Sequence, residues 1–274
     1  MQEEIYKRMY EVEGAHWWFA GKRRIIYDLL SRYVRRPGGL ATGGLAAGDL
    51  AAGGSAATGS AANGGLATGG AARVADLGCG CGKMLEELPR GFSGVGLDAS
   101  ATAAAFCRAR GVTAVVGALP GDVPFAQGSF DAVILADILE HVEDDAGAAA
   151  AAARLLRPGG VMIATAPAFP WLWSSWDEIH GHKRRYTAGS FRAALGGAGL
   201  QIELASYYNT FLFPAAVVGR LAKKITGARS ARELSIPPAW LNAVLGAIFA
   251  SERHLLGRVP LPVGLSLVAV LRKP

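Results

Sequence analysis

Three closely spaced glycines behind an acidic residue are the first group in this 274-residue chain that can do chemistry. The segment from Val74 to Gly82 reads Val-Ala-Asp-Leu-Gly-Cys-Gly-Cys-Gly, a short apolar strand that runs into a glycine turn before a helix. Glycine adopts positive φ at little steric cost, so such a turn lets backbone N–H groups approach a ligand. A dinucleotide-binding turn needs Gly-x-Gly-x-x-Gly, and Lys83 stands where its third glycine belongs. The spacing disfavours a dinucleotide, while a tight turn without a ligand remains an alternative.

Asp98 ends the next expected strand, residues 94–98. An acid at this place can accept hydrogen bonds from both hydroxyls of a ribose. The alternative is that Asp98 caps the helix expected from Ala101. Ligands of open α/β sheets bind outside the carboxyl ends of the strands. The residues expected at that edge are Asp76, Gly78, Asp98 and Asp137.

Three further segments accompany the glycine turn in a fixed order. They are Pro-Phe-x4-Phe-Asp-Ala-Val at 124–133, Asp-Ile-Leu-Glu-His-Val at 137–142 and Leu-Leu-Arg-Pro-Gly-Gly at 155–160. Together with Gly-x-Gly-x-Gly at 78–82, this pattern resembles the class I S-adenosylmethionine (SAM) methyltransferases of the methyltransferase-11/12 type. The resemblance covers residues 73–166, and the combination is more specific than any of its parts.

The resemblance implies a set of SAM-binding residues. Asp76 would orient the amino end of SAM, the glycine turn would line its methionine part, and Asp98 would hold the ribose. Many relatives carry an acid after the third strand that binds the adenine amino group, but residues 117–119 here are Gly-Ala-Leu. Backbone groups and apolar contacts would replace it. The full implied set is Asp76, Gly78, Cys79, Gly80, Gly82, Asp98, Ala99, Ala118, Leu119, Ala136 and Asp137.

Methyl transfer to a hydroxyl needs a base when the hydroxyl has a high pKa. Four residues are candidates, and the sequence favours His141, His182 and Tyr186 over His180. The stretch from His182 to Tyr186 resembles a His-x-x-Arg-Tyr signature that follows the fifth strand in small-molecule and lipid-directed members of this family. The alternative for each histidine is a structural role, such as capping the next helix.

A metal-assisted variant is a second alternative. Asp137, Glu140 and His141 would share one helical face at positions i, i+3 and i+4. With His180 or His182 they could hold Mg²⁺ or another divalent ion. The ordinary interpretation assigns no metal ligand, because these residue types are common in the family and form no dedicated cage.

The elements that must position these residues form an α/β fold. Alternating strands and helices predict a Rossmann-like three-layer sandwich, with a mostly parallel seven-stranded sheet and an antiparallel C-terminal strand. The strands are expected at 74–77, 94–98, 112–116, 130–135, 161–164, 201–206 and 265–271. The helices of this part are expected at 83–88, 101–110 and 137–156.

The chain divides into three expected parts. Residues 1–36 form a helical cap, whose aromatic run at 16–19 either closes over a site or packs on the main domain. Residues 37–72 are a flexible low-complexity insertion, almost only Gly, Ala, Ser, Thr and Leu. Residues 73–274 form the SAM-binding domain.

Within the last part, 209–264 is an expected helical insert. Its apolar runs are shorter than the ~20 residues that span a bilayer. The insert would be a lid over an apolar acceptor pocket, a surface for peripheral membrane contact, or a dimer interface, in that order. The oligomeric state is not predicted.

The composition of the chain limits the classes of molecule that we expect it to bind. The net charge of +6 favours an anionic or lipid-linked acceptor, but no basic stripe with interleaved aromatics indicates nucleic acid. Three cysteines form no disulfide framework, and the charged N-terminus lacks a signal-peptide core. We therefore expect a cytoplasmic protein that can lie at the inner face of the membrane.

The sequence as a whole predicts a SAM-dependent methyltransferase that acts on a small or lipid-like acceptor, most often at oxygen. Two other functions stay open. One is a SAM-binding protein without turnover, and the other is a nicotinamide-linked reductase, which the glycine spacing disfavours.

Overall fold

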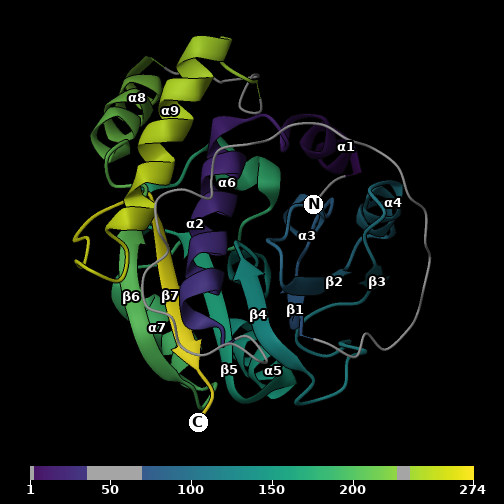
Figure 1. The fold of residues 1–274 in the computed structure, drawn as a ribbon. Helices are drawn as coiled ribbons and strands as arrows, with labels where there is room; N and C mark the ends of the chain where they lie inside the picture. The colour runs from purple at the N-terminus through teal and green to yellow at the C-terminus, as the bar shows by residue number, and fades with distance from the viewer. Residues whose placement is uncertain (1–2, 36–69, 227–234) are drawn as a thin grey trace.

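A seven-stranded sheet forms the centre of the molecule (Figure 1). The computed structural model describes residues 3–35, 70–226 and 235–274. Its strand order is β3-β2-β1-β4-β5-β7-β6, and β7 runs antiparallel to both of its neighbours. This confirms the predicted fold class. The strands are β1 (Ala72–Leu77), β2 (Phe92–Asp98), β3 (Ala114–Val116), β4 (Phe130–Ala136), β5 (Leu156–Pro167), β6 (Gln201–Tyr208) and β7 (Ser266–Arg272).

Helices cover both faces of the sheet (Figure 1). The α-helices are α1 (Glu3–Val12), α2 (Trp17–Tyr33), α3 (Lys83–Glu86), α4 (Ala101–Ala109), α5 (Asp145–Leu155), α6 (Ser175–His180), α7 (Ala188–Gly196), α8 (Phe213–Thr226) and α9 (Ala239–Ser251). Three short 3-10 helices are η1 (Leu139–His141), η2 (Pro170–Leu172) and η3 (Glu252–His254). Helices α5 and α7 pack on one face, and α2 and α9 pack on the other.

The central strand β4 shows how the sequence builds these layers. Its residues from Phe130 to Leu135 are all buried, as in a sheet covered on both sides. Because successive side chains point to opposite faces, Val133 and Leu135 join the core under α5 and α7. Ala132 and Ile134 join the core under α2 and α9.

The helix predicted over 137–156 is wrong. Asp137 has φ +56, which stops a right-handed helix after β4. A single 3-10 turn, η1, follows, and Val142 is extended. Helix α5 begins only after Asp144, whose side chain caps it by accepting the N–H of Gly147.

Other helix and strand boundaries differ by a few residues between the sequence prediction and the structure. Helix α3 ends at Glu86 rather than at residue 88, because Pro89 disfavours helical backbone just before it. Strand β5 begins at Leu156, which pairs with Phe130, so the 157–160 turn lies within the strand. Strand β1 begins at Ala72, and the rest of the expected insertion, 37–69, lies outside the described residues.

The N-terminal helices and the insert meet over the sheet. Helix α2 buries Ile25, Ile26, Leu29 and Leu30. Its Gly21 allows close contact with α9, since a Cβ there would lie 2.4 Å from the Phe249 ring. The side chain of Asn242 in α9 also accepts the N–H of Trp17 at 2.9 Å.

Candidate active site

A large cleft runs along the edge of the sheet where β1, β2, β4, β5 and β6 end. Its volume is about 1520 Å³. Pockets for one small molecule usually measure about 300–1,000 Å³, so this cleft has room for two ligands. The glycine turn and the ends of β2 and β4 line one half of it. The 169–185 loop, α8 and α9 line the other half, and α1 and α2 reach across.

The glycine turn has the geometry that the sequence predicts. Gly78, Gly80 and Gly82 have φ of +84, +54 and +81, which other residues rarely adopt. A Cβ on Gly78 would lie 2.7 Å from the side chain of Ile138. Gly82 does not line the cleft; it precedes α3, where a Cβ would lie 2.8 Å from Cys107 Sγ.

Asp98 lies at the centre of a hydrogen-bond network at the end of β2. Its Oδ2 accepts the backbone N–H of Gly80 at 2.9 Å, and its Oδ1 accepts the Ser100 N–H at 2.9 Å. The hydroxyl of Tyr6, from α1, donates to Oδ1 at 3.1 Å. Ser100, not Asp98, caps α4, so the helix-cap alternative is wrong.

Two further acids lie at the ends of β1 and β4. Asp76 is buried, and burial raises its pKa to about 7 although Lys22 lowers it. Asp137 accepts hydrogen bonds from Lys22 Nζ at 2.9 Å and from the Thr165 hydroxyl at 2.8 Å. Burial raises the pKa of Asp137, but the charge and hydrogen bond of Lys22, together with the hydrogen bond from Thr165, hold the pKa below its usual value.

The remaining residues predicted to bind SAM also line the cleft. Ala99, Ala118 and Leu119 lie beyond β2 and β3, and Ala136 ends β4. With Asp76, Gly78, Cys79, Gly80, Asp98 and Asp137, the structure brings together every predicted SAM-binding residue except Gly82.

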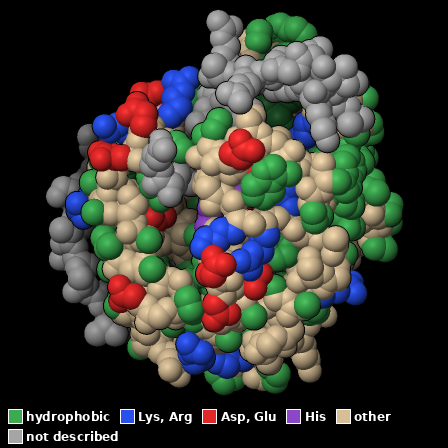
Figure 2. Space-filling view, turned by 180° about the vertical axis from the view of Figure 1, so that it is seen from behind, with side chains coloured by type: hydrophobic (Ala, Val, Ile, Leu, Met, Phe, Trp, Pro, Cys, Tyr) green, Lys and Arg blue, Asp and Glu red, His purple; other side chains and the backbone are tan. Residues whose placement is uncertain are grey.

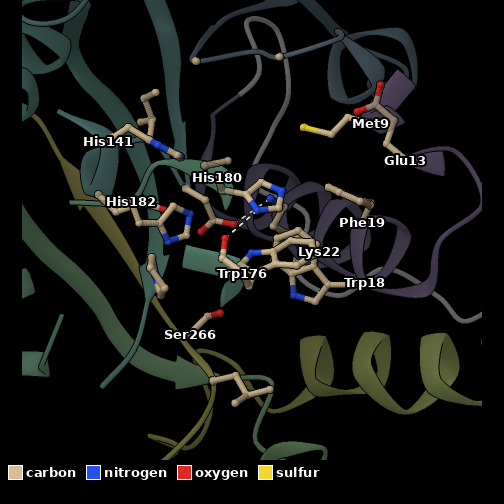
Figure 3. Close-up of a pocket in the computed structure, with 18 of the residues that line it drawn as sticks. Met9, Glu13, Trp18, Phe19, Lys22, His141, Trp176, His180, His182 and Ser266 are labelled. Atoms are coloured by element: carbon tan, nitrogen blue, oxygen red, sulfur yellow. Dashed lines mark hydrogen bonds and ion pairs between the residues drawn. The ribbon is translucent and has the colours of Figure 1, made fainter. Parts of the chain in front are cut away.

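Two histidines and a glutamate form a cluster in the cleft, and Figure 3 labels the histidines, His141 and His182. One ligand atom from each of Glu140, His141 and His182 lies within 4.8 Å of the other two. The rings of His141 and His182 meet edge to face, with centroids 4.8 Å apart. Burial, and then the charge of His182, lowers the pKa of His141 to about 4, so its imidazole is neutral at pH 7.

Glu140 is the most buried member of this cluster. Its side chain is fully buried and lines the cleft, and no other described residue gives its carboxyl oxygens a hydrogen bond. Burial, and then the negative charge of Asp137, raises the pKa of Glu140 well above its usual value. Asp137 itself is not part of the cluster, so the ligand set expected on one helical face is wrong.

Asp177 stabilises the 169–185 loop through hydrogen bonds within the loop. Its Oδ1 lies 2.8 Å from His182 Nδ1 and accepts a hydrogen bond from Arg185 Nε at 2.7 Å. Burial raises the pKa of Asp177, but the bonds from His182 and Arg185 lower it to about 2. The carboxylate thereby fixes the orientation of the His182 ring.

Tyr186 lies away from the cleft. It is 2% exposed, does not line the cleft, and donates its hydroxyl to Asp145 Oδ2 at 2.7 Å. Burial raises the pKa of the Tyr186 hydroxyl above its usual range. The predicted catalytic role of Tyr186 has no geometric support. His180, the fourth candidate, lines the cleft, stacks on Trp176 and places its Nδ1 2.9 Å from the carbonyl oxygen of that residue.

The sequence predicts that the aromatic run of the N-terminal cap either closes over a site or packs on the main domain, but it does not identify Lys22 and Tyr6 as the cap residues that contact the cleft acids. Lys22 is buried, and its Nζ lies 4.3 Å from the centroid of the Trp18 ring (Figure 3). Tyr6 reaches Asp98 across 92 positions of sequence. The run of aromatic and basic residues at 16–24 indicates that the cap has a role. No sequence pattern, however, shows that these residues contact Asp137 or Asp98, which lie far away in the chain.

The comparisons with known proteins concern the part of the chain that carries the glycine turn. A family model described as a methyltransferase domain matches residues 75–164. The ubiquinone biosynthesis O-methyltransferase of Methylococcus capsulatus is 35% identical over 98 residues, which are 33% of this chain and 41% of that protein. The enzyme of the same name from Xanthomonas oryzae is 38% identical over 99 residues, 34% of this chain and 41% of that protein. The chain thus spans about two-fifths of the length of these relatives.

A solved structure agrees with the fold. In a complex with the Haloferax volcanii Trm112 methyltransferase activator, the methyltransferase-like chain has a TM-score of 0.50 and 21% identity to this chain. The match covers 74% of this chain and 83% of that one. The segment matched by the family model contains the glycine turn and the strands β2, β3 and β4 of the sheet. Residues 75–164 of this chain are therefore similar to the methyltransferase domain family.

Proposed function

We propose that the chain transfers the methyl group of SAM to an oxygen of a small or lipid-like acceptor. The observation that carries this proposal is that one cleft holds both the predicted SAM-binding residues and the histidine cluster. A transferase that uses two substrates needs such an arrangement, because its main task is to hold donor and acceptor close and aligned.

The residues of the donor half fit SAM. Asp76 is a buried carboxyl group of the cleft that suits the positive charge of the amino-acid ammonium, and Asp137 lies beside it, paired with Lys22. Asp98 accepts three hydrogen bonds in the structure and suits ribose hydroxyls. When bound, SAM supplies an electrophilic methyl group on its sulfonium.

The acceptor half provides a base. His141 is neutral at pH 7 and lines the cleft, so it can take the proton of an acceptor hydroxyl. His182, fixed by Asp177, orients the acceptor or shares that proton. Support for oxygen as the accepting atom comes from the relatives described as ubiquinone biosynthesis O-methyltransferases.

A transfer assay tests this proposal. The protein is incubated with methyl-labelled SAM and 4-hexylcatechol, a small apolar acceptor with two hydroxyls. We expect label in the methyl ether of the catechol, and a loss of at least a hundredfold in kcat for His141→Gln, within the range that general base catalysis contributes. Binding of SAM without transfer to any hydroxylated acceptor would instead support the non-catalytic SAM-binding function.

A metal-assisted transfer is the second candidate. The cluster of Glu140, His141 and His182 favours it, because Glu140 is buried at the cleft without a partner in another described residue. Calorimetry with MgCl2 and MnCl2 tests this variant, with Glu140→Gln as the comparison. Binding that Glu140→Gln abolishes supports it, and full activity after chelation eliminates it.

Contact with a membrane surface is a further part of the proposal. No helix among the described residues is long and apolar enough to cross a bilayer. Figure 2 shows hydrophobic side chains gathered along one side of the molecule, and the exposed ones on α8 and α9 include Val218, Trp240 and Val244. Sedimentation with anionic phosphatidylglycerol vesicles tests this contact. Trp240→Ser should reduce the bound fraction, and no binding by the unaltered protein would contradict it.

A further inference from the structure

Asn209 is a buried polar residue that the SAM site does not use. It follows β6 and is 1% exposed, yet neither its side-chain oxygen nor its side-chain nitrogen has a hydrogen-bond partner among the described residues. It lines the cleft. Nearly all buried side-chain amides are paired, so an unpaired one at a cleft indicates a function rather than a structural role.

The turn around Asn209 is held in one conformation. Asn209 has φ +58, one of three such non-glycine residues in the described part of the chain. The fully buried Glu252 accepts the backbone N–H of Phe211 at 2.8 Å and faces the backbone N–H groups of Thr210 and Asn209. The Asn209 carbonyl accepts the N–H of Leu265 at 3.3 Å. The carboxamide is therefore presented by a fixed backbone, as a recognition group must be.

The sheet places Asn209 on the acceptor side of the cleft. The SAM-binding residues belong to β1, β2 and β4, whereas Asn209 follows β6, three strands beyond β4. At ~4.8 Å per strand, this separation is about 14 Å. Ser266, which begins β7 beside it, also lines the cleft (Figure 3).

Small and apolar residues of the insert line the same cleft as Asn209. They are Leu212, just before α8, Ala215 and Ala216 from its first turn, and Leu245 from α9. Arg220 of α8 also lines the cleft and donates a hydrogen bond to the Leu172 carbonyl. A carboxamide offers two donors and one acceptor but no charge. It suits a hydroxyl or carbonyl oxygen better than a carboxylate or phosphate, which a charged partner binds more strongly.

We propose that the Asn209 carboxamide binds the neutral oxygen head group of an amphiphilic methyl acceptor, whose apolar part lies against α8 and α9. This assignment rests on the proposed function and names the acceptor class for the same cleft. Asn209 is then a specificity-determining residue. Its amide has no hydrogen-bond partner among the described residues, and a hydroxyl or carbonyl of the acceptor supplies one.

Binding of two probes tests the assignment. Calorimetry compares 4-hexylcatechol with hexylbenzene, each added to the full chain in the presence of S-adenosylhomocysteine. We expect the catechol to bind at least tenfold more tightly, and Asn209→Gly to reduce this preference about tenfold. Glycine accepts the positive φ, so this variant keeps its fold and its melting temperature. Its SAM affinity stays unchanged.

Asn242→Ala is the matched control. The oxygen and the nitrogen of the Asn242 carboxamide are both hydrogen-bonded, because it accepts the Trp17 N–H and donates to the Ala15 carbonyl at 2.8 Å. We expect this variant to lose stability and to keep the preference for the catechol. Equal binding of both probes by the unaltered protein, or an undiminished preference in Asn209→Gly, overturns the assignment. Failure of the unaltered protein to bind SAM would contradict the proposed function instead.

Discussion

At the scale of single residues, burial sets the protonation of the acceptor site. His141 is neutral because burial and His182 lower its pKa to about 4. Burial, and then the negative charge of Asp137, raises the pKa of the neighbouring Glu140 well above its usual value. A neutral imidazole therefore lines the cleft at pH 7, where it can accept a hydrogen bond from a neutral acceptor hydroxyl.

The lowered pKa of His141 predicts a pH-dependent stability. Between about pH 4 and 6.5 the unfolded chain binds a proton at this residue and the folded chain does not, so the free energy of unfolding falls as pH falls through that window. Urea unfolding at pH 4.5, 5.5 and 7 measures it. His141→Gln should flatten the fall, and an unaltered pH dependence in this variant would argue against a buried neutral imidazole.

At the scale of elements, strands and the glycine turn follow from local sequence, whereas the cap does not. Runs such as Phe130–Leu135 are apolar enough to predict a buried strand, and glycine spacing predicts the turn. The helix predicted from Asp137 failed, because that residue is held in a left-handed conformation and bonds to Lys22 and Thr165, which lie far away in sequence. The sequence did not predict a role for Asn209 either, because its positive φ and its place at the cleft depend on residues far away in sequence, such as Glu252 and Leu265.

The contact between α2 and α9 predicts opposite effects of one substitution at two glycines. Gly21→Ala should lower the free energy of unfolding by about 1–3 kcal/mol, because its methyl would lie 2.4 Å from the Phe249 ring. Gly219→Ala, in α8, meets nothing within 4 Å and should raise it by about 0.5–1 kcal/mol through helix propensity alone. Urea unfolding compares them. Equal effects would mean that α2 and α9 do not pack this closely.

At the scale of the whole molecule, the cleft joins parts that lie far apart in the sequence. The sheet supplies the SAM-binding edge, the N-terminal helices reach across it, and the insert adds an apolar wall. The family pattern covers 75–164, the donor half, and most of the implied SAM-binding residues could therefore be predicted. The acceptor half is assembled from α2, the 169–185 loop and the insert, whose packing no family motif describes.

Calorimetry with SAM and NADH tests the central claim most directly, because the glycine spacing of the turn at 78–82 distinguishes these two ligands. The account predicts that SAM binds at one site per chain and that NADH does not bind. Asp98→Asn, which removes the charge and keeps the shape, should weaken SAM binding by about ten- to a hundredfold, or ~1–3 kcal/mol. Binding of NADH without SAM, or an unchanged SAM affinity in Asp98→Asn, would contradict it.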